Sequence, residues 1–218
     1  LHDASVEGGS TDSEYFWLDL YVARLIAQAA PARHVDVGSR VDGFVAHVAS
    51  FRAIEVLDIR PITAQVPGVI FRQLDLMQLP REFESYCDSL SCLHALEHFG
   101  LGRYGDPIQP RGHEDGLRNL ARIVRPGGVF YLALPVGRAR VLFNSHRVLD
   151  PARMVSLARE CGLGLHALAW HVPGEQGVRE SAAIFSAGQD DPFEADLTHL
   201  QGLPYAVGIF KFVREELK

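Results

Sequence analysis

The chain has 218 residues, 47% of them hydrophobic, and a formal net charge of −6 at pH 7. This length and apolar content predict one domain around one core, and the acidic balance argues against nucleic acid as the main partner. No apolar stretch approaches the roughly 20 residues that a membrane-spanning helix requires.

Three cysteines lie in apolar segments, at Cys87, Cys92 and Cys161. Their odd number and apolar surroundings predict reduced, buried thiols that pack rather than react, as in a cytoplasmic protein. Residues 1–14 are polar and predict a loose arm. Residues 15–218 predict a single domain with loop insertions at 100–113 and 173–204.

The first predicted helix covers Tyr15 to Ala30, where apolar residues recur at helical spacing until Pro31 stops the helix. The aromatic residues Tyr15, Phe16 and Trp17 at its start are more than one helix face needs. They either belong to the core or cover a ligand pocket.

A strand, a tight turn, a helix and a second strand follow over residues 34–58. Gly38, after the first β-prone run, permits a tight turn or a close approach of the backbone. Apolar residues from Val41 to Val48 recur with the period of a helix. Asp58 ends the second strand about 20 residues past the turn, where an acid can bind both hydroxyls of a ribose. The unit therefore predicts a nucleoside-containing ligand.

The next two strands place more polar residues at the same edge of the predicted sheet. A third strand over 69–73 precedes Asp75, which either reads an adenine amino group or caps a turn. A fourth strand over 86–92 runs into the polar segment His94–His98. Open α/β sheets bind ligands at the tips of their parallel strands, so this segment is expected near the cleft.

A long loop rich in glycine and proline covers 100–113 and carries Arg103, Tyr104, Asp106 and His113. Above the tip of a strand, such a loop is typical of a substrate lid or wall, and the alternative is a solvated connector.

The remaining segments continue to alternate between helices and strands. They are a helix that ends at Arg125-Pro126-Gly127-Gly128, a strand over 129–134, a polar loop over 138–147, a helix capped by Asp150, and strands over 163–172 and 205–213. This alternation predicts an α/β fold with a mostly parallel sheet. No helix is evident between the last two strands, so an antiparallel pair is expected at one edge. Residues 182–187 are a candidate for an extra edge strand, and the 173–204 segment is either a lid or a homodimer contact.

Six segments together resemble a known family: HVDVGSRVDGFVAHVASF, LDIRP, LDLM, DSLSCLHALEHFGLGRYGDP, RPGGVFYLALPVG and FNSHRV. They resemble the S-adenosylmethionine-dependent methyltransferases with a Rossmann-like seven-stranded sheet, and the resemblance covers nearly all of Tyr15 to Val213. Within that superfamily the chain is similar to an uncharacterised bacterial group known only as a domain of unknown function.

The resemblance implies a Rossmann-like sheet with helices on both faces, an antiparallel last strand and S-adenosylmethionine as the cofactor. It implies that the methionine end of the cofactor is bound by Asp36, Gly38, Ser39, Arg40, Cys92, Leu93 and His94. It implies that ribose and adenine are bound by Asp58, Ile59, Asp75 and Leu76.

The glycine turn departs from the family pattern, which is usually acid-x-Gly-x-Gly-x-Gly. Ser39 and Arg40 stand where the second glycine is expected, so a bulky cation lies where the backbone should approach the ligand. Arg40 either binds the methionine carboxylate or blocks the site. Because Asp58 and Asp75 are both retained, we expect cofactor binding.

A general base is needed only if the methyl acceptor is a hydroxyl or a protonated amine. The candidates are His98, His146, Asp106 and His113, in loops at the carboxyl edge of the sheet, and each also has a structural interpretation. Four arginines, Arg103, Arg138, Arg140 and Arg147, either recognise an anionic acceptor or are solvated surface. No metal is expected, because there is no Cys-x-x-Cys and no His-Glu-x-x-His motif.

The sequence thus predicts methyl transfer to a small polar acceptor, with a saccharide or other metabolite hydroxyl favoured. One alternative is a non-catalytic methyltransferase-like binding protein in a glycan-assembly complex. A nicotinamide-dependent reductase is the other, but the Gly-x-Gly-x-x-Gly turn that it requires is absent.

Overall fold

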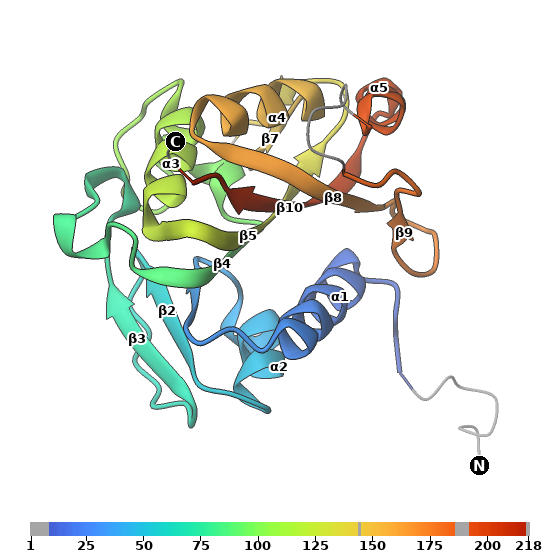
Figure 1. The fold of residues 1–218 in the computed structure, drawn as a ribbon. Coiled ribbons are helices and arrows are strands. Elements are labelled where there is room, and N and C mark those ends of the chain that lie inside the picture. The colour runs from blue at the N-terminus through green and yellow to red at the C-terminus, as the bar shows by residue number, and fades with distance from the viewer. Residues whose placement is uncertain (1–8, 144, 186–191, 217–218) are drawn as a thin grey trace, which may run out of the picture.

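The computed structural model describes residues 9–143, 145–185 and 192–216, and a central twisted sheet crosses it (Figure 1). The strand order is β3 (Val69–Gln73), β2 (Ile54–Asp58), β1 (His34–Val37), β4 (Cys87–Leu93), β5 (Val124–Val136), β10 (Ala206–Arg214), β8 (Leu163–His171) and β9 (Arg179–Glu180). β1 to β5 run parallel, whereas β10 is antiparallel to both of its neighbours. The expected α/β fold with an antiparallel last strand is confirmed.

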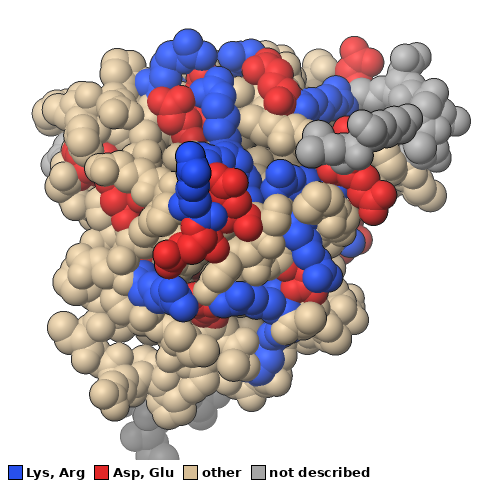
Figure 2. Space-filling view, turned by 60° about the vertical axis from the view of Figure 1, so that its left-hand side comes forward, with Lys and Arg blue, Asp and Glu red and all other residues tan. Residues whose placement is uncertain are grey.

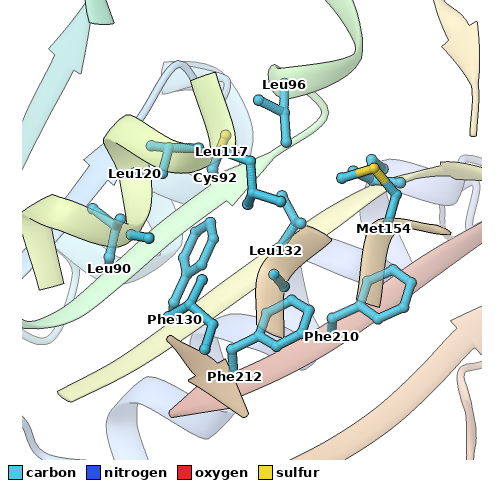
Figure 3. Close-up of a cluster of buried hydrophobic side chains, with 14 of the residues drawn as sticks. Leu90, Cys92, Leu96, Leu117, Leu120, Phe130, Leu132, Met154, Phe210 and Phe212 are labelled. Carbon is cyan, nitrogen blue, oxygen red and sulfur yellow. The ribbon is translucent and has the colours of Figure 1, made fainter. Parts of the chain in front are cut away.

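Helices cover both faces of this sheet (Figure 1). α1 (Glu14–Ala29) and α2 (Ala46–Ala49) lie on one face, and α3 (Gly112–Ile123), α4 (Pro151–Glu160) and α5 (Glu194–Gly202) lie on the other. Each face has its own buried apolar cluster. Figure 3 shows the cluster beneath α3, where Leu117 and Leu120 pack over Phe130 and Cys92 of the sheet.

Local capping explains the ends of two predicted helices. The Ser13 side chain accepts a hydrogen bond from the Tyr15 N–H at the start of α1, and Ala30 ends the helix in the left-handed conformation just before Pro31. Asp150 caps α4 by accepting from the Arg153 N–H. Both helices therefore agree with the sequence prediction to within a residue or two.

The helix between β1 and β2 is shorter than its apolar pattern suggests. A wide turn over Val41–Val45 precedes the four residues of α2, and Gly43 has non-helical dihedrals. A Cβ at Gly43 would lie 2.4 Å from the Asp19 carboxylate of α1. Gly43 therefore breaks the helix to make room for a buried acid.

The second half of the chain differs from prediction in three places. β10 lies inside the sheet between β5 and β8, so the antiparallel pair is not confined to an edge. Helix α5 was not predicted, because its buried residues Leu197 and Leu200 are too few to give a helical stripe. The extra edge strand is β9 rather than 182–187; residues 181–185 form no strand, and residues 186 and 187 lie outside the described part of the chain.

The start of β5 and the loop after it also differ from prediction. The Arg125–Gly128 segment was expected to cap a helix, but α3 ends at Ile123 and Val124 already pairs with Cys87. The predicted polar loop contains a small hairpin of β6 (Arg140–Val141) and β7 (Arg147–Val148). This hairpin holds residues 145 and 146 beside the tips of the parallel strands.

The surface carries mixed charge where it can be seen. On the face shown in Figure 2, basic and acidic side chains are interspersed. Ion pairs of the described residues include Arg72 of β3 with Glu55 of β2, and Arg122 of α3 with Glu84. Over the described residues, every helix is too short or too polar to cross a membrane. Of the predicted arm, residues 1–8 lie outside the described residues, and α1 begins at Glu14.

Candidate functional site

A cavity of about 430 Å³ lies at the carboxyl ends of β1, β2 and β4. Gly38 follows β1, Asp58 ends β2 and His94 follows β4, so the parallel topology brings all three to one edge of the sheet. The start of α1, the 100–111 loop and the β6–β7 hairpin complete the wall. The site is therefore built from segments spread over almost the whole chain.

Gly38 forms the floor of the cavity. Its φ is 70°, which favours glycine, and its N–H donates to the Leu57 carbonyl at 3.0 Å. A Cβ at this position would lie 2.8 Å from the Cβ of Ala95. The absent side chain thus leaves bare backbone facing the cavity.

Asp36 and Ser39 lie beneath this floor and do not line the cavity. The Asp36 carboxylate accepts hydrogen bonds from the Ser39 hydroxyl at 2.7 Å and from the Ser91 hydroxyl at 2.5 Å, and Ser39 Oγ accepts from the Leu93 N–H at 3.2 Å. Burial raises the pKa of Asp36 to about 6, although these hydrogen bonds oppose the shift. The two residues hold the turn against β4.

Cys92 and Leu93 also lie away from the cavity lining. Cys92 is fully buried and points into the cluster beneath α3 (Figure 3). Burial raises the pKa of its thiol well above the usual value. Both residues were expected beneath the cofactor, and the structure makes them part of the supporting core.

Arg40 lies at the margin of the cavity and leaves the space above Gly38 open. Its guanidinium donates to the Asp42 carboxylate at 3.1 and 2.7 Å and lies 5.0 Å from the ring centre of Tyr15. The blocking role considered for this residue is not seen in this arrangement.

Asp58 lines the cavity as predicted, but its carboxylate is already paired. Arg60 donates from Nε to Oδ1 at 3.0 Å and from Nη2 to Oδ2 at 2.6 Å. The same guanidinium lies 4.7 Å from the ring centre of Tyr104 in the 100–111 loop. A ribose at Asp58 would share the carboxylate with Arg60 or displace it.

The far end of the cavity has an apolar wall. Ile59, Leu76 and Met77 line it beside Asp75. The Asp75 carboxylate accepts from the Met77 N–H at 2.9 Å and so caps the turn Leu76–Gln78. Asp75 therefore caps a turn, which is one of its two predicted roles, and it also lines the cavity.

His94 and Glu97 form a buried pair at the opposite end, and their side chains are 5% and 2% exposed. His94 has a φ of 53°, a left-handed conformation that turns the chain directly after β4. The residue lines the cavity at this turn. Its Nδ1 lies 3.2 Å from Glu97 Oε1, and its Nε2 lies 3.8 Å from Glu14 Oε1. Burial alone would lower the pKa of His94, but the hydrogen bond to Glu97 and nearby carboxylates, including Glu14, raise it.

Two further histidines flank this pair. His98 Nδ1 donates to the Ser145 carbonyl at 2.9 Å, which leaves its Nε2 as an acceptor, 3.8 Å from Glu97 Oε1. His146 Nδ1 lies 2.8 Å from Ser145 Oγ. Burial lowers the pKa of both imidazoles, so they are neutral near pH 7 and able to take a proton.

The other predicted bases are Asp106, which holds loop backbone, and His113, which lies outside the cavity lining. The Asp106 carboxylate lies at the cavity edge and accepts three loop N–H groups, from Gly100, Gly102 and Tyr104. His113 lies on α3 outside the cavity lining, where burial and then the charge of Arg147 lower its pKa to about 4. The structure therefore separates His113 from the site.

The arginines expected to bind an anionic acceptor mostly bind backbone. Arg147 donates to the carbonyls of Glu97 and Phe99, Arg138 to that of Gly202 and Arg140 to that of Pro204. Arg103 lines the cavity and donates to the Ser145 carbonyl at 2.8 Å. Among the described residues, no three His, Cys, Asp or Glu side chains are arranged to hold a metal ion.

Ten of the residues expected in the site line one cavity: Gly38, Arg40, Asp58, Ile59, Asp75, Leu76, His94, His98, Asp106 and His146. The sequence prediction missed Glu14, Arg60 and Tyr205. The Tyr205 hydroxyl donates to Glu14 at 2.9 Å across 191 positions of sequence, a contact that no local pattern signals. Tyr15 lines the cavity, in agreement with the second of its two interpretations.

Comparisons with known proteins place the chain in a family and a fold. A family model described as "Caenorhabditis protein of unknown function, DUF268" matches residues 50–163, just over half of the chain. This description gives no support to the bacterial group expected from the sequence. No curated protein matches the chain.

Solved structures of similar fold are abundant, and three illustrate their range. The 1,6-didemethyltoxoflavin-N1-methyltransferase of Burkholderia thailandensis, with bound 1,6-didemethyltoxoflavin and S-adenosylhomocysteine, has a TM-score of 0.62 and 14% identity over 94% of this chain and 80% of that chain. The N-methyltransferase NodS of Bradyrhizobium japonicum, in complex with S-adenosylhomocysteine, has a TM-score of 0.59 and 13% identity over 94% and 90%. The [4+2]-cyclase SpnF has a TM-score of 0.56 and 15% identity over 89% and 81%. At these identities the likeness shows the Rossmann-like methyltransferase fold alone.

Proposed function

The chain belongs to this DUF268 family of unknown function, and we propose that it is an S-adenosylmethionine-dependent methyltransferase with a small polar acceptor. One observation carries the proposal. A single cavity runs from Asp58 and Asp75, past the bare backbone of Gly38, to the buried pair of His94 and Glu97. This order matches the succession of adenosine, methionine and acceptor that methyl transfer requires.

The residues present fit the cofactor. The carboxylate of Asp58 accepts hydrogen bonds, as ribose hydroxyls need, and Ile59 and Leu76 offer apolar surface to a purine. The backbone at Gly38 is accessible to the methionine portion, and Arg40 stands close enough to the same wall to attract its carboxylate. Two of the solved structures of the same fold hold S-adenosylhomocysteine, which supports this assignment.

When bound, S-adenosylmethionine supplies a methyl group carried on a sulfonium sulfur. The leaving group is the neutral thioether that remains. The protein therefore needs mainly to orient the acceptor and exclude water. Tyr15 and Tyr104 wall the cavity, and Glu97, His98 and His146 offer groups that orient a hydroxyl and take its proton. This supports an oxygen acceptor, such as a saccharide or another metabolite hydroxyl.

One other function has a specific argument in its favour. The cyclase of the same fold indicates that this architecture is compatible with reactions other than methyl transfer, so a non-catalytic or differently reactive relative is the second candidate. A nicotinamide-dependent reductase is disfavoured, because Ser39 and Arg40 replace the glycine that its turn needs.

The free thiols of Cys87, Cys92 and Cys161 support a reducing, cytoplasmic location.

The test is calorimetric titration with S-adenosylmethionine and S-adenosylhomocysteine. We expect micromolar binding that Asp58→Ala abolishes and that Asp115→Ala, an exposed acid on α3, retains. A folded protein that binds neither compound contradicts the proposal and favours the non-catalytic alternative. Binding without transfer to any acceptor leaves that alternative in place as well.

A further inference from the structure

Unpartnered polar atoms gather at one end of the cavity. Six buried side-chain nitrogen or oxygen atoms in the described residues make no hydrogen bond, and three belong to residues of this lining: His94 Nε2, Glu97 Oε2 and His146 Nε2. A buried polar group without a partner destabilises the fold, so such groups rarely gather without a ligand to bind. The cluster points to a ligand that supplies their missing partners.

The two most buried atoms of this set have complementary hydrogen-bonding character. Glu97 Oε1 already faces His94 Nδ1, and Oε2, the other oxygen of the carboxylate, is an acceptor without a partner. His94 Nδ1 donates to that carboxylate, and Nε2 lies 3.8 Å from the Glu14 carboxylate. Carboxylates on both sides of the ring favour the imidazolium, whose Nε2–H is a donor, in agreement with the raised pKa of His94. Two contacting residues of the cavity lining therefore offer one acceptor and one donor.

We propose that Glu97 and His94 bind adjacent hydroxyl groups of a polyol acceptor and that Glu97 is the catalytic base. This inference rests on the proposed methyltransferase function. The hydroxyl oxygen forms a bond to the sulfonium methyl carbon, the carbon–sulfur bond breaks with its electron pair going to sulfur, and the hydroxyl proton moves to Glu97 Oε2. Solvent later removes that proton.

An amine fits the same atoms less well. An ammonium group has only donors, so it would satisfy Glu97 but leave the Nε2–H of His94 without an acceptor. It would also place a positive charge beside the imidazolium. A hydroxyl both donates and accepts, and two neighbouring hydroxyls satisfy Glu97, His94 and the third open atom, His146 Nε2.

The other side chains near the pair are consistent with an uncharged ligand. Glu14 is held by the Tyr205 hydroxyl at 2.9 Å, and the Tyr15 ring packs against His94 at an angle of 49°, with ring centres 4.8 Å apart. The Arg103 guanidinium of the 100–111 loop, which lines the same cavity, donates to the Ser145 carbonyl. These contacts leave hydrogen bonding, rather than a free charge, to select the acceptor.

The test uses protein loaded with S-adenosylhomocysteine and labelled with ¹⁵N in its histidine rings. Glycerol, erythritol and methyl α-glucopyranoside are compared with ethylammonium at concentrations up to about 0.5 M. We expect the polyols to shift the His94 ring signals and ethylammonium to bind at least tenfold more weakly. Glu97→Gln and His94→Gln should each weaken polyol binding at least tenfold, whereas Glu84→Gln, a matched change at an exposed acid, should not.

Several results would overturn the inference. They are tighter binding of ethylammonium than of every polyol, no polyol binding, unchanged polyol binding by Glu97→Gln, or polyol binding that EDTA abolishes and Mn²⁺ restores.

Tritiated S-adenosylmethionine then tests the base role with the polyol that binds best. Glu97→Gln should lower kcat about 100-fold or more with a smaller change in KM, and an equal rate, or no transfer by the wild type, contradicts that role.

Calorimetry with S-adenosylhomocysteine separates this inference from the proposed function. If the wild type fails to bind that compound, the proposed function fails first. If the wild type and Glu97→Gln bind it equally and the polyol results are negative, only the assignment of the acceptor is lost.

Discussion

At the scale of single residues, Arg60 decides how open the nucleoside end of the cavity is. Its guanidinium pairs with both oxygens of Asp58 and is itself 44% exposed. Solvent-exposed ion pairs contribute about 0.2–1 kcal/mol, and the exposed guanidinium brings this pair toward that range although Asp58 is only 6% exposed. The pair is therefore weak enough for a ribose to replace it.

We predict that Arg60→Gln tightens the binding of S-adenosylhomocysteine by up to about fivefold, because 1 kcal/mol corresponds to that factor. Calorimetry measures the change. Arg72→Gln is the matched control, since Arg72 pairs with Glu55 outside the cavity lining. Weaker binding by Arg60→Gln would instead identify Arg60 as a ligand of the cofactor.

Gly38 offers a second test at this scale. In Gly38→Ala the new Cβ meets Ala95 at 2.8 Å in a backbone with φ of 70°, whereas Gly127 has a φ of 75° and nothing within 4 Å of a built Cβ. Left-handed strain alone costs about 1–2 kcal/mol. We expect Gly127→Ala to lose that amount in urea unfolding and Gly38→Ala to lose more and also to bind cofactor weakly. Equal losses and normal binding would show that the floor tolerates a side chain.

At the scale of elements, the 100–111 loop is organised by one carboxylate. Asp106 accepts the N–H groups of Gly100 at 2.8 Å, Tyr104 at 3.2 Å and Gly102 at 3.3 Å. The loop in turn places Tyr104 over Arg60 at the cavity. The shape of the cavity wall thus depends on a residue that we first considered as a base.

We predict that Asp106→Ala speeds hydrogen exchange of these three loop amides at least tenfold while Tm falls by only a few degrees, because local opening costs less than global unfolding. Exchange measured by NMR or mass spectrometry reports the change. Asp115→Ala, on α3, is the control and should leave the loop amides protected. Unchanged exchange in Asp106→Ala would show that other contacts hold the loop.

At the scale of the whole molecule, the repeating parts of the fold were predictable and the exceptions were not. β1, β2, β3, β4 and β8 agree with their predicted ranges within a residue or two. For β1, β2 and β4 the reason is that strands buried inside a parallel sheet need continuous apolar runs. Helix α5 has only two buried residues, and its position is determined by packing against α4. The insertion of β10 between β5 and β8 depends on long-range pairing that periodicity does not encode.

The site divides in the same way. Asp58, Asp75 and His94 were predictable because the ends of parallel strands meet at one edge of a sheet. Glu14 and Tyr205 join the site only through the folded positions of α1 and β10. Asp36 and Ser39 carry the expected motif but act below the cavity floor, since a sequence motif does not state which side chains remain exposed.

Buried ionisable groups of opposite type set the response of the whole molecule to acid. Burial raises the pKa of Asp19 and of Asp36 to about 6, so each stabilises the fold at low pH and loses that contribution as pH rises through 6. Burial lowers the pKa of His34 to about 3 and of His113 to about 4. Each histidine contributes stability above pH 6.5 and loses it as pH falls. As pH rises from 4 to 6, the two aspartates therefore lower the free energy of unfolding while the two histidines raise it.

We therefore expect the free energy of unfolding of the wild type to change little between pH 4 and 6. Asp19→Asn removes one contribution that declines with pH, so the unfolding free energy of this variant should rise with pH by about 1 kcal/mol more per unit than that of the wild type. Urea unfolding at pH 4, 5 and 6 measures both curves, with Asp115→Asn as the exposed control. Parallel curves for Asp19→Asn and the wild type would mean that Asp19 keeps an ordinary pKa in the folded protein, and that its burial against Gly43 is compensated by contacts other than protonation.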